Sequence, residues 1–239
     1  MSNAQDPIGS AILEYLSTKN ESSIIVESNL TEDDEIPVPY LFRTKKQLPP
    51  KEIHAISKVQ GRILDVGAGA GSHSLILQAE NKNVVSLDIS EKCCEAMKLQ
   101  GIKNVICADF FEFKDEEQFD TILLLMNGFG IAGTLENLPR LLEQCKSLLK
   151  PGGIIIGESA DILYLFEEED GSYNIDLNGN YYGEMQYRMS YNNITGEWFD
   201  WLYVSSDLIS DCAETVGLKV LEVEKGENDD FIIYIENSI

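Results

Sequence analysis

The chain has 239 residues, of which 44% are hydrophobic, enough for one substantial core, and we expect one domain with additions. Its formal net charge of −23 repels the phosphate backbones of nucleic acids, so a nucleic-acid partner is not favoured. The longest apolar runs, at 122–126 and 154–156, are far too short to span a bilayer, and no apolar leader segment opens the chain. We therefore expect a cytoplasmic protein with no membrane partner.

The five cysteines and two histidines show no spacing that is typical of a metal site. Cys93 and Cys94 are adjacent, and the sequence contains no C-x-x-C pair. We therefore predict reduced, structural thiols and no bound metal. The oligomeric state does not follow from the sequence.

The first 48 residues are predicted to form a polar N-terminal extension, or lid, ahead of a main domain at 49–239. Pro49 and Pro50 are predicted to open the first helix of that domain, because proline suits the first helical turn. The predicted elements that follow are a strand at 63–66, a helix at 72–80, a strand at 84–87, a helix at 91–99, strands at 104–107 and 121–126, a helix at 135–149 that stops at the turn 150–153, and a strand at 154–157.

This alternation of strands and helices predicts an α/β fold with a doubly wound, mostly parallel sheet. The run at 121–126 is continuously apolar, as expected of a central strand that is covered on both faces. In such folds ligands bind at the carboxyl ends of the strands. The pattern changes after 157.

Residues 158–204 are predicted to be an insertion over the active site that contains an antiparallel hairpin. Its alternating segments at 183–191 and 197–204 flank an Asn-Asn-Ile-Thr-Gly turn. Its aromatic side chains can form an ordinary packed sheet face, or part of that face can form the roof of a site and select an apolar or aromatic acceptor. A helix from Ser205 or Ser206 to Val216, a strand at 218–223, a turn at 226–230 and a strand at 231–236 follow, and this last strand pair closes one edge of a seven-stranded sheet.

The segment between the first two strands of the main domain forms a cradle for a small molecule. Gly67, Gly69 and Gly71 let the backbone take positive φ and approach a ligand closely. The next helix directs its first N–H groups to the same place, and Asp88 at the end of the next strand can accept both ribose hydroxyls of a nucleoside. Glycine spacing alone does not discriminate between kinds of nucleotide site, although the dinucleotide pattern is G-x-G-x-x-G and this chain has G-x-G-x-G.

Three further features accompany the glycines: Asp65 before the turn, Asp109 after the third strand, and Leu149-Lys150-Pro151-Gly152-Gly153 before the fifth. Together with Asp88, they resemble class I S-adenosylmethionine-dependent methyltransferases from about residue 40 to 236. The segments 67–73 and 125–130 are most similar to a group of bacterial methyltransferases whose acceptors we cannot name. The resemblance implies a Rossmann-like methyltransferase fold, S-adenosylmethionine as cofactor with S-adenosylhomocysteine as product, and in-line methyl transfer to a small-molecule substrate.

The resemblance also implies which residues bind the cofactor. The glycine turn would lie against the methionine moiety, Asp88 would bind the ribose, and Asp109 the adenine amino group. Phe110 and Ile89 would flank the adenine ring. Asp65 would either contact the cofactor or cap backbone amides of the turn. The full implied set is Asp65, Gly67, Ala68, Gly69, Gly71, Asp88, Ile89, Asp109, Phe110 and Asn127.

Candidates near the reacting atoms follow the fourth and fifth strands. Asn127 would meet both the methionine moiety and the acceptor, or it is a polar turn residue before Gly128. Similar methyltransferases are expected to have Asp-Ser-Ser-Asp where this chain has Glu158-Ser159-Ala160-Asp161, which leaves the roles of these residues open. The catalytic candidates are Asn127, Glu158, Asp161, Tyr164 and, for an anionic group, Arg43 from the lid.

Methyl transfer from a sulfonium needs neither a metal nor an oxyanion hole, so positioning supplies most of the catalysis. A general base is needed only where the acceptor is protonated. His73 is predicted to be a packed or solvent-facing residue. Two other functions remain open: a nucleoside-binding or interaction module of the same fold without catalysis, and a nicotinamide-dependent oxidoreductase, which would need the missing glycine spacing.

Overall fold

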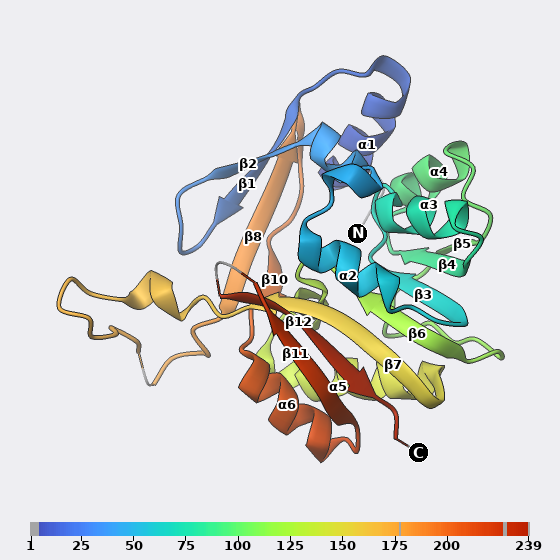
Figure 1. Ribbon diagram of the computed structural model, residues 1–239. Helices are drawn as coiled ribbons and strands as arrows, with labels where there is room; N and C mark the ends of the chain where they lie inside the picture. The colour runs from blue at the N-terminus through green and yellow to red at the C-terminus, as the bar shows by residue number, and fades with distance from the viewer. Residues whose placement is uncertain (1–4, 177, 227–228, 239) are drawn as a thin grey trace.

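The computed structural model describes residues 5–176, 178–226 and 229–238, so residues 227 and 228 of the predicted turn at 226–230 lie outside it. Its centre is a seven-stranded sheet in the order β11-β12-β7-β6-β3-β4-β5 (Figure 1). The strands are β3 (Arg62–Val66), β4 (Asn83–Asp88), β5 (Val105–Cys107), β6 (Phe119–Leu124), β7 (Leu149–Ala160), β11 (Lys219–Lys225) and β12 (Asp230–Glu236).

The five strands from β7 to β5 are parallel, and β12 is antiparallel to both β7 and β11. The predicted α/β class, with a doubly wound, mostly parallel sheet and an antiparallel edge, is therefore confirmed. No helix among the described residues is both long enough and apolar enough to cross a membrane.

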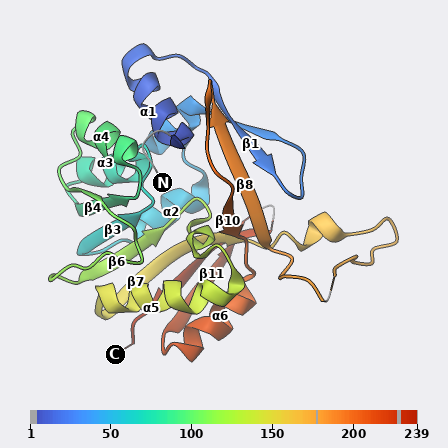
Figure 2. The same cartoon turned by 180° about the vertical axis from the view of Figure 1, so that it is seen from behind.

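Helices cover both faces of this sheet. They are α2 (Pro50–Ser57), α3 (Ser72–Ala79), α4 (Glu91–Leu99), α5 (Leu138–Leu148) and α6 (Ser206–Thr215). Successive side chains of a strand point to opposite faces, so Ile122 packs in the cluster with α5 and α6, whereas Leu123 packs in the cluster with α2 and α3. In Figure 1 α2 lies in front of the sheet, and in Figure 2 α5 lies in front of it. The run at 121–126 is continuously apolar because helices cover this strand on both faces of the sheet.

Several element boundaries differ from the prediction, among them the start of β7 and the end of β6. Strand β7 begins at Leu149 and runs through the predicted turn, because Leu149 already pairs with Phe119 and the Gly152 N–H donates to the carbonyl of Asn237 at 2.7 Å. Strand β6 ends at Leu124, two residues early. The reason is that Met126 and Asn127 both have φ of 55°, which breaks the extended backbone.

A second sheet has the order β10-β8-β1-β2, with the short β9 paired to β8. The predicted hairpin is present as β8 and β10, with Phe199 opposite Tyr187. The elements of this layer are α1 (Pro7–Thr18), β1 (Ser23–Ser28), β2 (Asp34–Pro37), β8 (Glu184–Tyr191), β9 (Ile194–Thr195) and β10 (Phe199–Leu202).

The expectation of a polar lead at the N-terminus missed α1, β1 and β2. Strand β1 lies between β2 and β8, so the first residues and the insertion form one sheet, as both Figure 1 and Figure 2 show. Ile24 and Val26 of β1 are buried at alternate positions. Asp6 caps α1 by accepting the Gly9 N–H at 2.8 Å, and proline occupies the first helical turn.

Candidate active site

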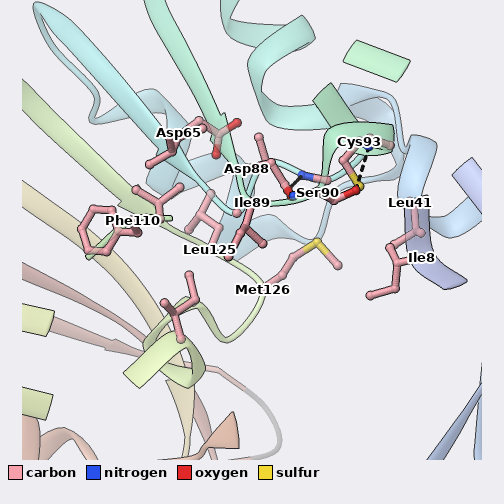
Figure 3. Close-up of a pocket in the computed structure, with 18 of the residues that line it drawn as sticks. Ile8, Leu41, Asp65, Asp88, Ile89, Ser90, Cys93, Phe110, Leu125 and Met126 are labelled. Atoms are coloured by element: carbon pink, nitrogen blue, oxygen red, sulfur yellow. Dashed lines mark hydrogen bonds between the residues drawn. The ribbon is translucent and has the colours of Figure 1, made fainter. Parts of the chain in front are cut away.

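A cavity of about 620 Å³ lies at the carboxyl ends of β3, β4 and β5 (Figure 3). Three of its walls follow these strands, at 65–70, 87–91 and 108–111. The opposite wall comes from the second sheet and its surroundings. The residues that contribute there are Ile8 of α1, Leu41 of the 3₁₀ segment η2 (Val38–Phe42), Met189 of β8 and Trp201 of β10. The two sheets therefore enclose one cavity between them.

The glycine turn between β3 and α3 forms the floor of this cavity. Gly67 and Gly69 line it and have φ of 67° and 56°. A Cβ on Gly69 would have only the Gly67 carbonyl oxygen within reach, at 4.0 Å, so the space beside it is open for a ligand. Gly71 does not line the cavity, and its Cβ would lie 2.3 Å from Cδ1 of Ile102. A glycine at this position therefore allows close packing against Ile102.

Asp88 ends β4 and stands over the turn. Its Oδ2 accepts the Gly69 N–H at 2.7 Å, and its Oδ1 accepts the Ser90 N–H at 2.8 Å. Burial raises the pKa of Asp88, against the opposing effect of these two backbone donors. The carboxylate is thus fixed in place, and each oxygen keeps a lone pair for a further donor from the cavity.

Asp65 also lines the cavity, but its hydrogen bonds run to α3. Its Oδ2 accepts from Oγ of Ser74 at 2.6 Å, and Oγ of Ser86 donates in turn to Ser74 at 2.6 Å. These side chains are buried, and burial raises the pKa of Asp65. The chain of hydrogen bonds joins the first turn of α3 to β3 and β4.

Asp109, Phe110 and Ile89 line the end of the cavity beyond Asp88. Phe110 is buried, whereas 53% of Ile89 is exposed. Oδ1 of Asp109 accepts the Phe111 N–H at 2.8 Å, and Nε2 of Gln144 donates to the Phe110 carbonyl at 2.8 Å. A hydrogen bond within the segment after β5 and one from Gln144 of α5 therefore hold this segment in place.

The end of β6 borders a second, smaller cavity of about 280 Å³. Met126 lines both cavities, and Figure 3 shows its side chain extending into the larger one. Asn127 lines the smaller cavity and not the larger one. Left-handed backbone at two successive non-glycine residues is strained, and such strain is concentrated at functional sites. The remaining residues that line the smaller cavity are Tyr40, Glu52, Glu158, Ser159, Ala160, Tyr203 and Asp230.

Glu158 supports this strained segment. Its Oε2 accepts the Met126 N–H at 2.7 Å, and its Oε1 lies 2.8 Å from Nζ of Lys51. Lys51 also forms an ion pair with Asp230. Nδ2 of Asn127 donates to the Leu202 carbonyl at 3.3 Å, while its buried Oδ1 has no hydrogen-bond partner within the described part of the chain.

The other predicted catalytic candidates lie elsewhere. Asp161 accepts from the Tyr182 hydroxyl at 2.7 Å and from the Leu163 N–H at 3.0 Å. Half of the Tyr164 side chain is exposed. Neither residue lines either cavity. The structure therefore does not bring them together with Asn127 and Glu158.

Arg43 is buried, and its guanidinium binds both carboxylate oxygens of Glu52, at 2.8 and 3.1 Å. Nε2 of His73 lies 2.7 Å from Oε2 of the same carboxylate. We call these three side chains the Arg43–Glu52–His73 triad. The sequence suggested Arg43 as a free cation for an anionic group, but its guanidinium is already paired with Glu52. Sequence reasoning missed Glu52, because nothing in the local sequence of α2 marks this acidic first-turn residue as the partner of Arg43.

Opposing effects set the charges of the triad. Burial alone would lower the pKa of His73, but its hydrogen bond to Glu52 and the nearby charge of Asp65 outweigh burial, and the net pKa is raised. Burial alone would raise the pKa of Glu52, but the hydrogen bonds from His73 and Arg43 outweigh it, and the net pKa is lowered. His73 lines the larger cavity and Glu52 the smaller, so the triad connects their walls.

A family model described as a methyltransferase domain matches residues 64–157, which include all three strand ends around the larger cavity. The crystal structure of a SAM-dependent methyltransferase from Bacteroides fragilis, in complex with S-adenosyl-L-homocysteine, is 41% identical to this chain. It superposes with a TM-score of 0.92 over 98% of this chain and 96% of that one. This chain belongs to the SAM-dependent methyltransferases.

Two named relatives of this methyltransferase align over less of their length. A demethylmenaquinone methyltransferase from Clavibacter sepedonicus is 36% identical over 109 residues, which are 43% of this chain and 42% of that protein. A ubiquinone biosynthesis O-methyltransferase from Xylella fastidiosa (strain 9a5c) is 26% identical over 120 residues, 44% of this chain and 49% of the relative. The aligned part of the chain spans less than half of either relative.

Proposed function

We propose that this methyltransferase binds S-adenosylmethionine in the larger cavity and transfers its methyl group to a small-molecule acceptor by in-line displacement. The observation that carries the proposal is the combination of an open glycine turn with the fixed Asp88 carboxylate at adjacent strand ends. When bound, the donor supplies a methyl group on a sulfonium, whose departure leaves a neutral thioether. The task of the chain is then to hold donor and acceptor in line.

The residues around the larger cavity fit the parts of this donor. Gly67, Ala68 and Gly69 offer backbone without obstructing side chains to the methionine moiety. Asp88 has lone pairs for the ribose hydroxyls. Ile89 and Phe110 present apolar surface to the adenine, beside the Asp109 carboxylate for its amino group.

The methyl group would leave at the end of β6. Met126 separates the two cavities there, and Glu158 fixes its backbone N–H. Asn127 adjoins the proposed transfer position on the side of the smaller cavity. Asp161 and Tyr164 take no part in this proposal because they lie outside both cavities, and Arg43 acts only by holding Glu52.

The acceptor is a small molecule in this proposal. The relatives that are named for menaquinone and ubiquinone chemistry align over less than half of their length, so their acceptors are not transferred to this chain.

Calorimetry with S-adenosylhomocysteine tests the donor site directly. We expect one molecule to bind per chain. The demethylated product is the better probe because it cannot react during the titration. No detectable binding of either the product or S-adenosylmethionine would contradict the proposed function.

A further inference from the structure

The smaller cavity is suited to the acceptor by its position. It lies at the ends of β6 and β7, and Met126 lines both it and the proposed donor cavity. A molecule bound there would lie next to the proposed donor cavity, with Met126 in the wall of both. This inference rests on the proposed function, since the donor must occupy the larger cavity.

The walls of the smaller cavity carry hydrogen-bond acceptors and aromatic rings. Its side chains include the carboxylates of Glu52, Glu158 and Asp230 and the rings of Tyr40 and Tyr203. No lysine, arginine or histidine is among the described residues that line it. Carboxylates and aromatic faces both attract cations, and the Arg43 guanidinium already lies over one face of the Tyr40 ring, 4.4 Å from its centroid. The wall therefore favours a ligand that donates hydrogen bonds and carries positive charge.

The charges behind the wall do not cancel this preference. Arg43 balances the charge of Glu52, and His73 is balanced by the nearby charge of Asp65, so these groups together carry no net charge. Glu158 and Asp230, in contrast, share the single ammonium of Lys51. These two carboxylates and one ammonium leave one negative charge at the cavity wall, and a bound cation would balance it.

Asn127 adds an independent indication. Its Oδ1 is buried and has no hydrogen-bond partner within the described part of the chain, while its Nδ2 is occupied by the Leu202 carbonyl. An oxygen in this state accepts a hydrogen bond from a donor and has nothing to give to an acceptor. Because Asn127 lines the smaller cavity next to Met126, an N–H group of a ligand that reached this buried oxygen would be its complementary partner.

We propose that the acceptor is a small amine held in the smaller cavity and that the enzyme methylates its nitrogen. The bound ammonium first gives one proton to a carboxylate of the wall, which passes it to solvent. The lone pair of the resulting neutral amine then forms the new N–C bond while the C–S bond breaks and its electron pair passes to sulfur. The product is a methylammonium, so one proton is released for each methyl group transferred. Positive charge moves from sulfur to nitrogen during transfer, and the carboxylates of the wall stabilise it there.

Paired ligands of equal shape test the proposal on the whole protein saturated with S-adenosylhomocysteine. The probes are benzylamine and cyclohexylmethylamine, each with the alcohol of the same skeleton as a neutral control, and binding is followed by saturation-transfer NMR. We expect the amines to bind more tightly than their alcohols by roughly ten-fold, the effect of one hydrogen bond to a charged group. Alcohols that bind as tightly as the amines, or amines that do not bind, would overturn the proposal.

Substitutions in the wall of the smaller cavity test whether the amine binds there. Glu158→Gln keeps an oxygen for the Met126 N–H but removes the charge, and Asp230→Asn removes the other carboxylate that faces Lys51. Both are expected to weaken amine binding roughly ten-fold and to leave alcohol binding unchanged. Glu112→Gln, an exposed change of the same charge outside both cavities, is the matched control. Unchanged amine binding in both cavity variants would overturn the assignment.

The two proposals fail in different ways. S-adenosylhomocysteine binding is measured first on every variant, and its absence in the unaltered protein contradicts the donor site. Normal S-adenosylhomocysteine binding without any preference for amines contradicts only the acceptor class.

Discussion

At the scale of single residues, the Asp88 carboxylate has two roles at once. It accepts the N–H groups of Gly69 and Ser90, which shapes the turn, and it lines the proposed donor cavity. The two roles are compatible because each carboxylate oxygen can accept two hydrogen bonds.

Asp88→Ala is expected to weaken S-adenosylhomocysteine binding by about 1.5–3 kcal/mol, because it removes hydrogen bonds to a charged group. Calorimetry measures the change. Asp170→Ala, an exposed change outside both cavities, should leave the affinity unaltered. An unchanged affinity in Asp88→Ala would remove this residue from the donor site.

The Arg43–Glu52–His73 triad makes the free energy of unfolding depend on pH. The raised pKa of His73 means that its contribution is complete below about pH 6.5 and is lost as pH rises through the native-state pKa. The lowered pKa of Glu52 means that its contribution is complete above about pH 4.3 and is lost as pH falls. The triad should therefore stabilise the protein most between these two values.

His73→Gln is expected to cost about 1–3 kcal/mol of unfolding free energy at pH 5.5 to 6.0, since it removes one buried charged hydrogen bond while Arg43 still pairs with Glu52. The deficit should shrink as pH rises above about 6.5. Urea unfolding of both proteins across this range provides the measurement. A deficit that stays constant up to alkaline pH would show that His73 is uncharged in the native protein.

The residues of the donor cavity could be predicted from the sequence, whereas the triad could not. Gly67, Gly69 and Asp88 follow strands in a local pattern, and parallel strand ends meet at one edge of the sheet. The triad joins three elements, and none of its three side chains is unusual for the helix or segment that carries it. Nothing periodic marks such a buried pairing, so only the tertiary structure reveals it.

At the scale of elements, the 3₁₀ segment η4 (Gly128–Ala132) packs against β10 through a glycine. A Cβ on Gly130 would lie 2.1 Å from Cε2 and 2.2 Å from Nε1 of Trp201. The indole ring therefore packs directly against the backbone of η4. This contact joins the second sheet to the end of β6 and places Trp201 in the wall of the larger cavity.

Gly130→Ala is accordingly expected to destabilise the protein by about 1–3 kcal/mol, because the rigid indole must move to make room for the methyl group. Gly196→Ala is the matched control, since its Cβ would meet its nearest neighbours at 3.4 Å, an ordinary contact. Chemical denaturation of both variants measures the difference. Equal stability of the two would mean that Trp201 is not closely packed on η4.

The elements that sequence analysis missed share one property. Strand β1 pairs with β8 more than a hundred and fifty positions further along the chain, where Ile25 lies opposite Ser190, and β2 joins the sheet only through β1. The strands of the main sheet, in contrast, alternate with their own covering helices, and this alternation is visible in a local window. Pairing between strands far apart in the sequence leaves no local pattern. The sequence therefore indicates only a polar extension for the first 48 residues.

At the scale of the whole molecule, two sheets from different parts of the chain enclose one cavity. The glycine turn and Asp88 belong to the main sheet, and Ile8, Met189 and Trp201 belong to the second layer. The donor would thus contact both. Its binding free energy should couple the stability of the two layers, because a ligand stabilises whatever must be folded to bind it.

Hydrogen exchange tests this coupling. Addition of S-adenosylhomocysteine is expected to slow amide exchange not only around the glycine turn but also in α1, β8 and β10, whose residues Ile8, Met189 and Trp201 form the opposite wall. Strand β11, which contributes no residue to either cavity among the described residues, is the internal control and should exchange at the same rate with and without ligand. Protection restricted to the main sheet would show that the second layer opens independently of the donor. Protection in both layers would make the second sheet part of the binding site, and the N-terminal residues would then act on donor affinity although they lie far from the glycine turn in sequence.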